Sequence, residues 1–393
     1  MSGATSTLAI FRIFLRLGCS CFGGPIAHLG YFRQEFVIRR AWLDEPAYAD
    51  LVGLCQFLPG PASSQVGFSL GLMRGGYAGG LAAWLGFTLP SAVALVLFAY
   101  GAGALHGALG TGILHGLKLV AVAIVAQAVL GMARSLCPDR PRAAIALLAL
   151  ILMQLAPGSV GQVLAIALGG AAGLLLVRAE TKVAGADTPA PVSRRAGIVF
   201  LAIFALLLAA AFVSWSSSGA ALFAAFYRSG ALVFGGGHVV LPLLRDAVVT
   251  PGWVPDASFL AGYGAAQAVP GPLFTFAAYL GAVAHPAPGG VAGAAIALAG
   301  IFLPGMLVLM GTLPFWHGLR AAARPRAAMA GVNAAVVGLL ASALYDPVWV
   351  SAVHTPRDFV VAAAGFVLLT VWQAPPLLVV AAAAFAGGVL GVA

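Results

Sequence analysis

Two arginines lie inside apolar stretches of this chain, and each precedes a pair of glycines at the same distance. Arg16 precedes Gly23-Gly24, and Arg228 precedes Gly235-Gly236. An arginine in apolar surroundings should face a cavity or a partner, because its charge is costly to bury. Its planar guanidinium can bind two oxygens of an oxyanion at once. The pattern therefore predicts an oxyanion site beside two helix breaks; the alternative is that both side chains extend to a membrane interface.

A second motif, Gln-x-x-Pro-Gly-Pro, also occurs twice, at 56–61 and at 267–272. Proline suits the first turn of a helix, where no N–H is needed, and the free amides that follow attract anions. The candidate ligand residues at these two tips are Gln56, Pro59, Gly60, Pro61, Ser63 and Ser64, and Gln267, Pro270, Gly271, Pro272 and Thr275. The two glutamines could bind the ligand or hold the tip to neighbouring backbone. The alternative is that each box is only a sharp turn between membrane spans.

Further polar residues follow the same duplication. Lys118 aligns with Asn333, so a cation in one copy corresponds to an amide in the other, and both are candidate anion ligands. Lysine near a helix end can instead extend to the interface. His28 and His238 follow the glycine breaks at slightly different positions. Either could titrate near neutral pH or simply pack, and His238 is counted among the candidate ligands.

Three acids lie near the expected cavity: Glu35, Asp50 and Asp246. Any of them could take up a proton to couple transport. Each could instead pair with a neighbouring arginine at the interface, which is the commoner role of such a carboxylate.

Residues for other chemistry are missing from the sequence. There is no nucleophile–base pair, no phosphate-binding loop and no metal-ligand cluster, and Cys19-x-Cys21 has no His or Cys partner at ligand spacing. The glycine-rich segments match helix packing rather than nucleotide binding. We therefore expect a protein that is not an enzyme, has no cofactor or metal, and does not bind nucleic acid.

The composition sets the environment in which these residues work. The chain is 62% hydrophobic and 8% charged, with a mean hydropathy of +1.03, so it has too little polar surface for a soluble globule. Apolar stretches of spanning length recur and are apolar all round, which excludes a membrane β-barrel. The sequence predicts an all-α, multi-pass protein of the lipid bilayer without a cleaved signal peptide.

The duplicated motifs define two membrane repeats. We expect an N-terminal repeat at 1–177, a polar cytoplasmic linker at 178–195, a connecting transmembrane helix at 196–215 and a C-terminal repeat at 216–393. Such repeats, broken by Gly and Pro at matching points, are typical of transporters. Full spans are expected at 77–105, 112–136, 141–156, 159–177 and 198–213, with the exact number of spans left open.

Loop charges predict the relative orientation of the repeats. The loop after the first break carries Arg33, Arg39 and Arg40, whereas its counterpart carries only Arg245. Other loop pairs are biased in the same reciprocal way. By the positive-inside rule, equivalent loops lie on opposite sides of the membrane. We therefore predict two inverted-topology repeats whose Gly/Pro-broken helical hairpins meet near the bilayer midplane.

At these motifs the sequence resembles the chromate ion transporter family in its long, two-domain form. The stretches that carry the resemblance are Phe22-Gly-Gly-Pro25, Gln56-x-x-Pro-Gly-Pro61, Phe234 to Leu243, Gln267-Ala-x-Pro-Gly-Pro272 and Gly331 to Leu340. The resemblance implies efflux of chromate from the bacterial cytoplasm across the inner membrane and chromate resistance. It also implies a relation to sulfate, a tetrahedral dianion of similar size.

A secondary carrier of chromate is thus the leading expectation, driven by membrane potential or by ion coupling. A sulfate or other oxyanion transporter and a chromate–sulfate antiporter are the alternatives. The helices are compatible with a homodimer but do not predict one. Ser63-Ser64 in the first repeat corresponds to Phe274-Thr275 in the second, so the two half-sites are not equivalent, and the sequence leaves open which one contacts the substrate.

Overall fold

The computed structural model describes residues 5–102, 107–177, 191–234, 237–286 and 288–390. Within these ranges the chain is helical and contains no strand. The predicted site residues Gly235 and Gly236, and most of the linker expected at 178–195, lie outside the described residues.

The first half consists of α1 (Thr7–Ser20), α2 (Gly24–Phe32), a π-helical turn (Arg33–Arg39), α3 (Glu45–Phe57), α4 (Ala62–Ala102), α5 (Gly107–Leu136), α6 (Arg140–Leu155) and α7 (Ser159–Leu176). The second half consists of α8 (Arg194–Ala210), α9 (Ser218–Ala231), α10 (Val240–Val248), α11 (Asp256–Ala268), α12 (Phe276–Val283), α13 (Gly290–Thr312), α14 (Trp316–Ala321), α15 (Ala323–Ala343), α16 (Pro356–Thr370) and α17 (Pro376–Leu390). Short 3₁₀ turns precede α10, α12 and α14, and a π-helical turn follows α15.

Helix α4 is a hairpin rather than one rod. Its backbone leaves helical geometry at Gly75 and Gly76, where Gly76 has φ +61°. A Cβ on Gly71 would lie 2.3 Å from the carbonyl oxygen of Gly79 and 2.7 Å from Cβ of Ala83. Residues so far apart in sequence touch only if the chain turns back on itself, since one straight helix would separate 71 and 83 by about 18 Å. The chain therefore turns at Gly75-Gly76, immediately before the span that the sequence predicts from residue 77.

Matching helices of the two halves pack alike. Gly18 lets α1 approach the carbonyl oxygen of Gly86 in α4, and Gly230 lets α9 approach that of Ile301 in α13. The long helices, by contrast, pack across the two halves: α5 packs on α17 of the second half, and α15 packs on α7 of the first. Each half thus completes the packing of the other.

These contacts across the two halves rest on glycine. A Cβ on Gly116 of α5 would lie 2.1 Å from the carbonyl oxygen of Ala383, and one on Gly331 of α15 would lie 2.1 Å from that of Gly169. Helix backbones can approach this closely only where the side chain is absent, as is common between membrane helices. The glycine-rich sequence is thus explained by packing.

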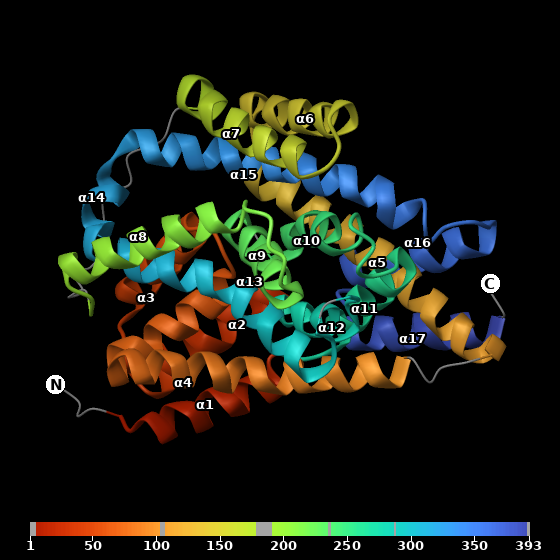
Figure 1. Cartoon of the computed structure of the whole chain (residues 1–393), viewed down its shortest axis with the longest axis horizontal. Coiled ribbons are helices and arrows are strands. Elements are labelled where there is room, and N and C mark those ends of the chain that lie inside the picture. Colours follow the sequence, from red (N-terminus) through yellow and green to blue (C-terminus); the bar gives the residue numbers. More distant parts are fainter. Residues whose placement is uncertain (1–4, 103–106, 178–190, 235–236, 287, 391–393) are drawn as a thin grey trace.

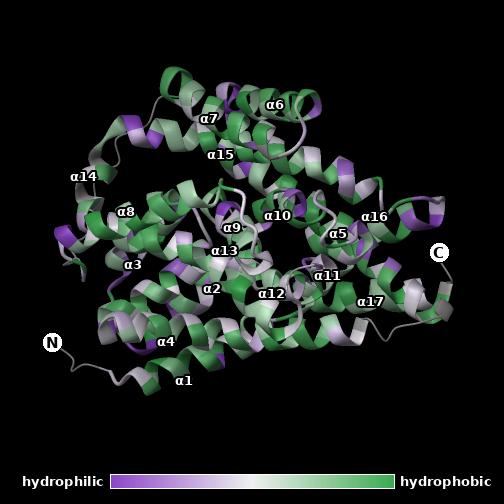
Figure 2. Ribbon diagram, viewed as in Figure 1, coloured by the Kyte–Doolittle hydropathy of each residue, from purple (hydrophilic) through white to green (hydrophobic). Residues whose placement is uncertain are grey.

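The outer surface is apolar. Leu155, Leu175 and Leu206 are 78%, 84% and 71% exposed, and Figure 2 shows hydrophobic residues along the helices, with hydrophilic ones mostly near helix ends and turns. Four helical stretches of the described chain are long and apolar enough to cross a bilayer: Ala62–Gly101, Leu109–Leu136, Gly290–Phe315 and Ala323–Trp349. The prediction of an all-α membrane protein is confirmed.

Three predicted spans form helices close to their predicted lengths, which are short for a full crossing of the bilayer. The stretches 141–156, 159–177 and 198–213 form α6, α7 and α8, with 16, 18 and 17 residues. A helix perpendicular to the bilayer needs about 20 residues to cross it. In Figure 1, α6 and α7 lie side by side over α15, so that these helices form an outer layer over the long ones.

Candidate functional site

The helix breaks of the two halves meet and are joined by two equivalent hydrogen bonds. The amide of Gly60, at the Pro-Gly-Pro tip of the first half, donates to the carbonyl oxygen of Val233, which follows α9, at 2.8 Å. The amide of Gly271, at the tip of the second half, donates to the carbonyl oxygen of Cys21, which follows α1, at 2.9 Å. Each tip therefore docks on the first break of the other half.

Both tips depend on glycine. Gly60 and Gly271 have φ +113° and +102°, a left-handed region that side chains disfavour. A Cβ on Gly60 would also lie 2.9 Å from Cα of Gly305, and one on Gly271 would lie 2.8 Å from Oγ of Ser91. The predicted tip glycines are therefore required by the backbone conformation and by the close approach of the opposite half.

The two tips continue differently. After Pro61, helix α4 begins directly, and its first intrahelical bond runs from the amide of Gln65 to the carbonyl of Pro61 at 2.9 Å. The amides of residues 62 to 64 precede that bond and have no intrahelical acceptor. After Pro272 the chain forms a 3₁₀ turn in which both the amide and Oγ1 of Thr275 donate to the Pro272 carbonyl, at 3.0 and 2.7 Å.

Gln65 holds the first tip in place. Its Nε2 donates to the carbonyl of Pro59 at 2.9 Å and to that of Gly305 in α13 at 2.8 Å. The sequence suggested this role for Gln56, which is exposed. Nε2 of Gln267, the counterpart of Gln56, is buried and has no hydrogen-bond partner among the described residues. Gln65 was missed as a site residue, although a polar side chain just inside an apolar helix was a usable signal.

A buried polar group lies beside the first tip. Nδ1 of His28 in α2 is 3.4 Å from Oγ of Ser63, and the imidazole stands edge-on to Phe87 with ring centroids 5.3 Å apart. His28, Ser63 and Ser64 are 0%, 3% and 4% exposed. In the second half, Nδ1 of His238 is instead 2.7 Å from the hydroxyl of Tyr263. The ring of His28 thus meets a side chain of the first turn of α4, whereas the ring of His238 meets a side chain of α11.

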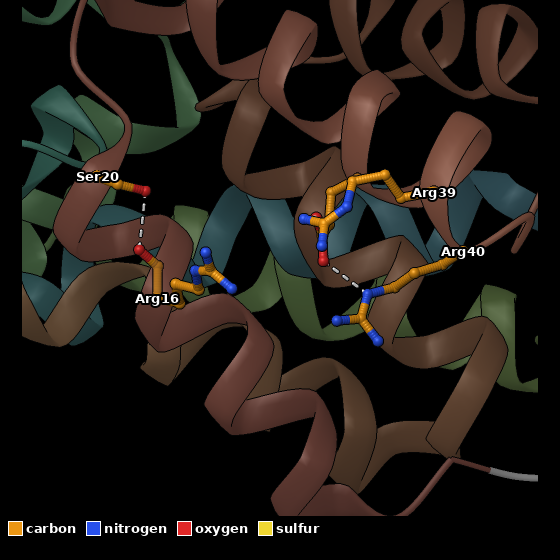
Figure 3. A network of polar contacts seen from close by, with 5 residues as sticks. Arg16, Ser20, Arg39 and Arg40 are labelled. Carbon is orange, nitrogen blue, oxygen red and sulfur yellow. Dashed lines mark hydrogen bonds and ion pairs between the residues drawn. The ribbon is translucent and has the colours of Figure 1, made fainter.

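The two predicted arginines have different surroundings. Arg228 is half-buried and donates from Nη1 to the carbonyl of Ala211 at the end of α8, at 2.9 Å, with its guanidinium 5.5 Å from the ring centre of Phe212. Arg16 is exposed, and its guanidinium has no hydrogen-bond or ion-pair partner among the described residues. Figure 3 shows its carbonyl accepting from Ser20, at 2.9 Å, while the guanidinium extends away from that bond. The structure therefore does not place the two guanidiniums in one shared cluster.

Lys118 and Asn333 lie on the long helices α5 and α15. Lys118 is half-buried and follows Leu117, whose carbonyl oxygen would lie 2.3 Å from a Cβ on Gly264 of α11. Lys118 is thus beside the helix that leads into the second tip. Oδ1 of Asn333 is buried without a hydrogen-bond partner among the described residues.

The coupling candidates have partners. Glu35 accepts from Arg39 at 2.5 Å and from Arg40 at 2.7 Å (Figure 3). Asp246 accepts from Nε2 of Gln162 in α7 at 2.7 Å. Asp50 also has an interaction with its surroundings. Glu35 thus has the arginine partners that the sequence left open beside proton coupling, whereas the partner of Asp246 is a glutamine amide.

The two hairpins are closed by equivalent ion pairs. Arg33 pairs with Glu45 at 2.6 Å in the first half, and Arg245 pairs with Asp256 at 2.9 Å in the second. Both pairs join the segment after the first break to the start of the helix that leads to the Pro-Gly-Pro tip. They join the two arms of each hairpin at its base, and the tip itself carries no charged side chain.

A cavity of 420 Å³ reaches the first break. Its lining includes Gly23, which precedes α2, together with Gln127, Arg134, Thr370 and Gln373. Gly23 has φ +98°, and because it lines the cavity the backbone of the break lies next to this space.

The loop beside the cavity is fixed by a capping carboxylate. Asp139 accepts from the amide of Arg142 at 3.0 Å and from its guanidinium at 2.6 Å. The bond from the Arg142 side chain lowers the pKa of Asp139 below its ordinary value. Arg134 has no carboxylate partner in the part of the chain that the structure describes, so that its charge remains available to the cavity.

Comparisons with known proteins agree with the duplicated architecture. The model of the chromate transporter family matches the chain twice, at residues 8–174 and 220–388. The chain is 31% identical over 375 residues to a chromate transport protein of Pseudomonas aeruginosa, covering 93% of this chain and 87% of the relative. It is 28% identical to a probable chromate transport protein of Synechococcus elongatus, covering 87% and 84%.

A third relative, a chromate transport protein of Cupriavidus metallidurans, is 26% identical over 386 residues, which cover 95% of this chain and 90% of the relative. No solved structure matches. Since the family model covers both halves and the relatives span most of the chain, this protein belongs to the chromate transporter family.

Proposed function

We propose that this protein is a secondary transporter that exports chromate from the cytoplasm across the inner membrane and thereby confers chromate resistance. The observation that supports this most is the meeting of the helix breaks, joined by the bonds from Gly60 to Val233 and from Gly271 to Cys21. In transporters built from repeats, substrates bind where broken helices meet near the bilayer midplane. The names of the relatives supply chromate as the substrate.

We infer further that the two halves are inserted in opposite orientations. The second arm of α4 runs from left to right in Figure 1, and α13, its counterpart, runs from right to left. The loop charges are reversed in the same sense, with Arg33, Arg39 and Arg40 in one half against Arg245 in the other. On the positive-inside rule, the hairpins of the first half then approach the centre from the cytoplasm, and those of the second from outside.

The cavity supplies a cytoplasmic access route. It is lined by Arg134 and Gly23, and Arg134 belongs to a loop that also carries Arg140 and Arg142. A basic group at the mouth of a cavity raises the local concentration of anions. Chromate would enter here and move toward the tips, where helix amides rather than full charges hold it.

Transport follows if the two halves rock about the tips. The bonds of Gly60 and Gly271 join each tip to the opposite half, so that a small rotation of one half relative to the other would open the tips to one side. An inside-negative potential favours outward movement of each negative charge by about 2.3 kcal/mol per 100 mV. A dianion can therefore be exported by the potential alone, and ion coupling through an acid such as Asp246 is needed only if the charge is compensated.

The test is uptake of radiolabelled chromate into everted inner-membrane vesicles that contain this protein. We expect uptake that rises with an imposed potential and falls with excess sulfate. Vesicles carrying a Gly60→Ala, Gly271→Ala variant at equal abundance are the matched control. Absence of uptake, together with sulfate flux in right-side-out vesicles, would refute export of chromate. Recovery of Cr(III) in place of Cr(VI) would indicate redox chemistry instead of transport.

A further inference from the structure

The first tip contains polar atoms that are buried and unsatisfied. Oγ of Ser64 and Nε2 of His28 have no hydrogen-bond partner among the described residues, and their residues are 4% and 0% exposed. A buried hydroxyl or imidazole N–H without a partner costs free energy comparable to a lost hydrogen bond. Two such groups, one on α4 and one on the helix α2 that packs against it, indicate a missing ligand.

These groups lie at or beside the N-terminus of helix α4. Ser63 and Ser64 are in the first turn of α4, where the backbone amides precede the Gln65–Pro61 bond and have no intrahelical acceptor. His28 reaches this turn from α2, with Nδ1 3.4 Å from Oγ of Ser63. If Nδ1 accepts from that hydroxyl, Nε2 carries the proton and is a free donor. Amides, hydroxyl and imidazole then offer donors at one helix N-terminus.

The second tip differs at each of these positions. Phe274 replaces Ser63, and Phe276 replaces Gln65. The Phe274 ring packs against Phe302 with centroids 5.8 Å apart, and the Phe276 ring packs edge-on against Phe259 at 5.2 Å. Thr275, the counterpart of Ser64, has its hydroxyl satisfied by the Pro272 carbonyl at 2.7 Å. The second tip is filled with aromatic rings and has no free hydroxyl at this turn.

We propose that a single tetrahedral oxyanion binds at the first tip only, held by the α4 N-terminal amides, the hydroxyl of Ser64 and Nε2 of His28, while the hydroxyl of Ser63 orients the imidazole. The hydroxyl of Thr275 in the second tip already donates to the Pro272 carbonyl and is not a ligand of this site. This inference rests on the proposed function and names the half-site at which the substrate is held.

The described conformation has the site closed. His28, Ser63 and Ser64 are almost wholly buried. The cavity that contains Arg134 is lined by Gly23, which precedes His28 by five residues. The anion therefore reaches the site when the segment around Gly23 moves. Because every donor is neutral, the site should bind chromate and sulfate alike. Discrimination between the two ions therefore takes place elsewhere on the transport path.

The test is binding of chromate, and separately of sulfate, to the purified full-length protein in lipid nanodiscs. Dissociation constants come from equilibrium dialysis and from the anion-dependent rise in thermal unfolding temperature. Ser64→Ala should raise the dissociation constant about tenfold or more, since it removes a hydrogen bond to a charged ligand. Its unfolding temperature without anion should stay at or above that of the parent, because the lost hydroxyl has no partner.

Thr275→Val is the matched control in the second half. It removes a satisfied hydroxyl, so the unfolding temperature without anion should fall while the dissociation constant changes less than twofold. A second variant pair tests the imidazole: His28→Leu should weaken binding as Ser64→Ala does, and His28→Gln, which keeps an N–H donor near the Nε2 position, should restore part of it.

The outcomes separate the inference from the function on which it rests. Binding unchanged in Ser64→Ala and His28→Leu, in a protein that still transports chromate, would overturn the first-tip site and leave the transporter intact. Weakened binding in Thr275→Val would move the site to the second tip. No binding of either anion by a folded parent protein that also fails in vesicles would overturn the proposed function itself.

Discussion

Gly60 donates its backbone N–H to the carbonyl oxygen of Val233 at 2.8 Å, although the two residues belong to different halves of the chain. Gly271 and Cys21 make the equivalent bond in the opposite direction at 2.9 Å. Two breaks that would each leave unpaired backbone groups in a bilayer thus satisfy one another. The two halves are consequently joined at the centre of the protein, and this joint consists of backbone hydrogen bonds rather than side-chain contacts.

Substitution of either tip glycine should disable this joint. Alanine at Gly60 or Gly271 must adopt φ above +100° and places Cβ within 3 Å of the other half. We expect a loss of about 2 kcal/mol or more in the free energy of unfolding and transport below one tenth of the parent rate. Gly53→Ala is the control, since a Cβ there meets nothing within 4 Å and alanine favours the helix. Parental transport by Gly60→Ala would show that the joint does not need this geometry.

The two sequence-predicted arginines should respond differently to removal. Arg228→Met loses the bond to the Ala211 carbonyl and the contact with Phe212, so the unfolding free energy should fall by about 1–3 kcal/mol. Arg16→Met should leave stability unchanged, because the exposed guanidinium has no hydrogen-bond or ion-pair partner among the described residues. Any defect of Arg16→Met should appear as slower transport. Chemical unfolding in detergent, followed by vesicle uptake, separates the two effects.

The sequence predicts the positions of the breaks but not their pairing. Gly and Pro at 59–61, 75–76 and 270–272 mark breaks because the local backbone requires them. Which carbonyl accepts from Gly60, and why Gln65 rather than Gln56 holds the tip, depends on a contact with Gly305 across 240 residues. No local pattern encodes such a contact. Arg16 and Arg228 are equivalent in sequence and differ in surroundings because α8 lies beside only the second of them.

The packing of long helices across the two halves predicts that neither half folds alone. Helix α5 packs on α17, and α15 packs on α7, through close contacts at Gly116 and Gly331. We expect a chain divided between α7 and α8 to give two fragments that are degraded when expressed singly. Co-expression should restore both fragments and part of the transport activity. Stable, monodisperse accumulation of the first fragment alone would contradict this interdependence.

A buried polar contact also joins the halves. Asp358 at the start of α16 is 1% exposed; it accepts from the amides of His354 and Thr355 at 3.0 and 2.8 Å and lies 2.9 Å from Nε2 of His115 in α5. Asp358→Ala leaves these donors buried and unpaired, so the unfolding free energy should fall by about 3 kcal/mol. Asp358→Asn keeps one carbonyl oxygen as acceptor and should lose less. Equal losses in both variants, measured by chemical unfolding, would mean that the charge rather than the acceptor oxygen stabilises the contact.

Arg134 should act on the arrival of the anion rather than on its binding at the tip. It lines the same cavity as Gly23, where a positive charge raises the local chromate concentration without contacting the buried site. Arg134→Gln should therefore raise the apparent KM for uptake roughly two- to fivefold at low salt and leave the maximal rate unchanged. High ionic strength should abolish the difference, because salt screens a charge that is exposed to water. Arg140→Gln removes a charge from the same loop at a position outside the cavity lining and should leave KM unchanged. A fall in the maximal rate of Arg134→Gln that persists in high salt would instead place Arg134 in direct contact with the transported ion.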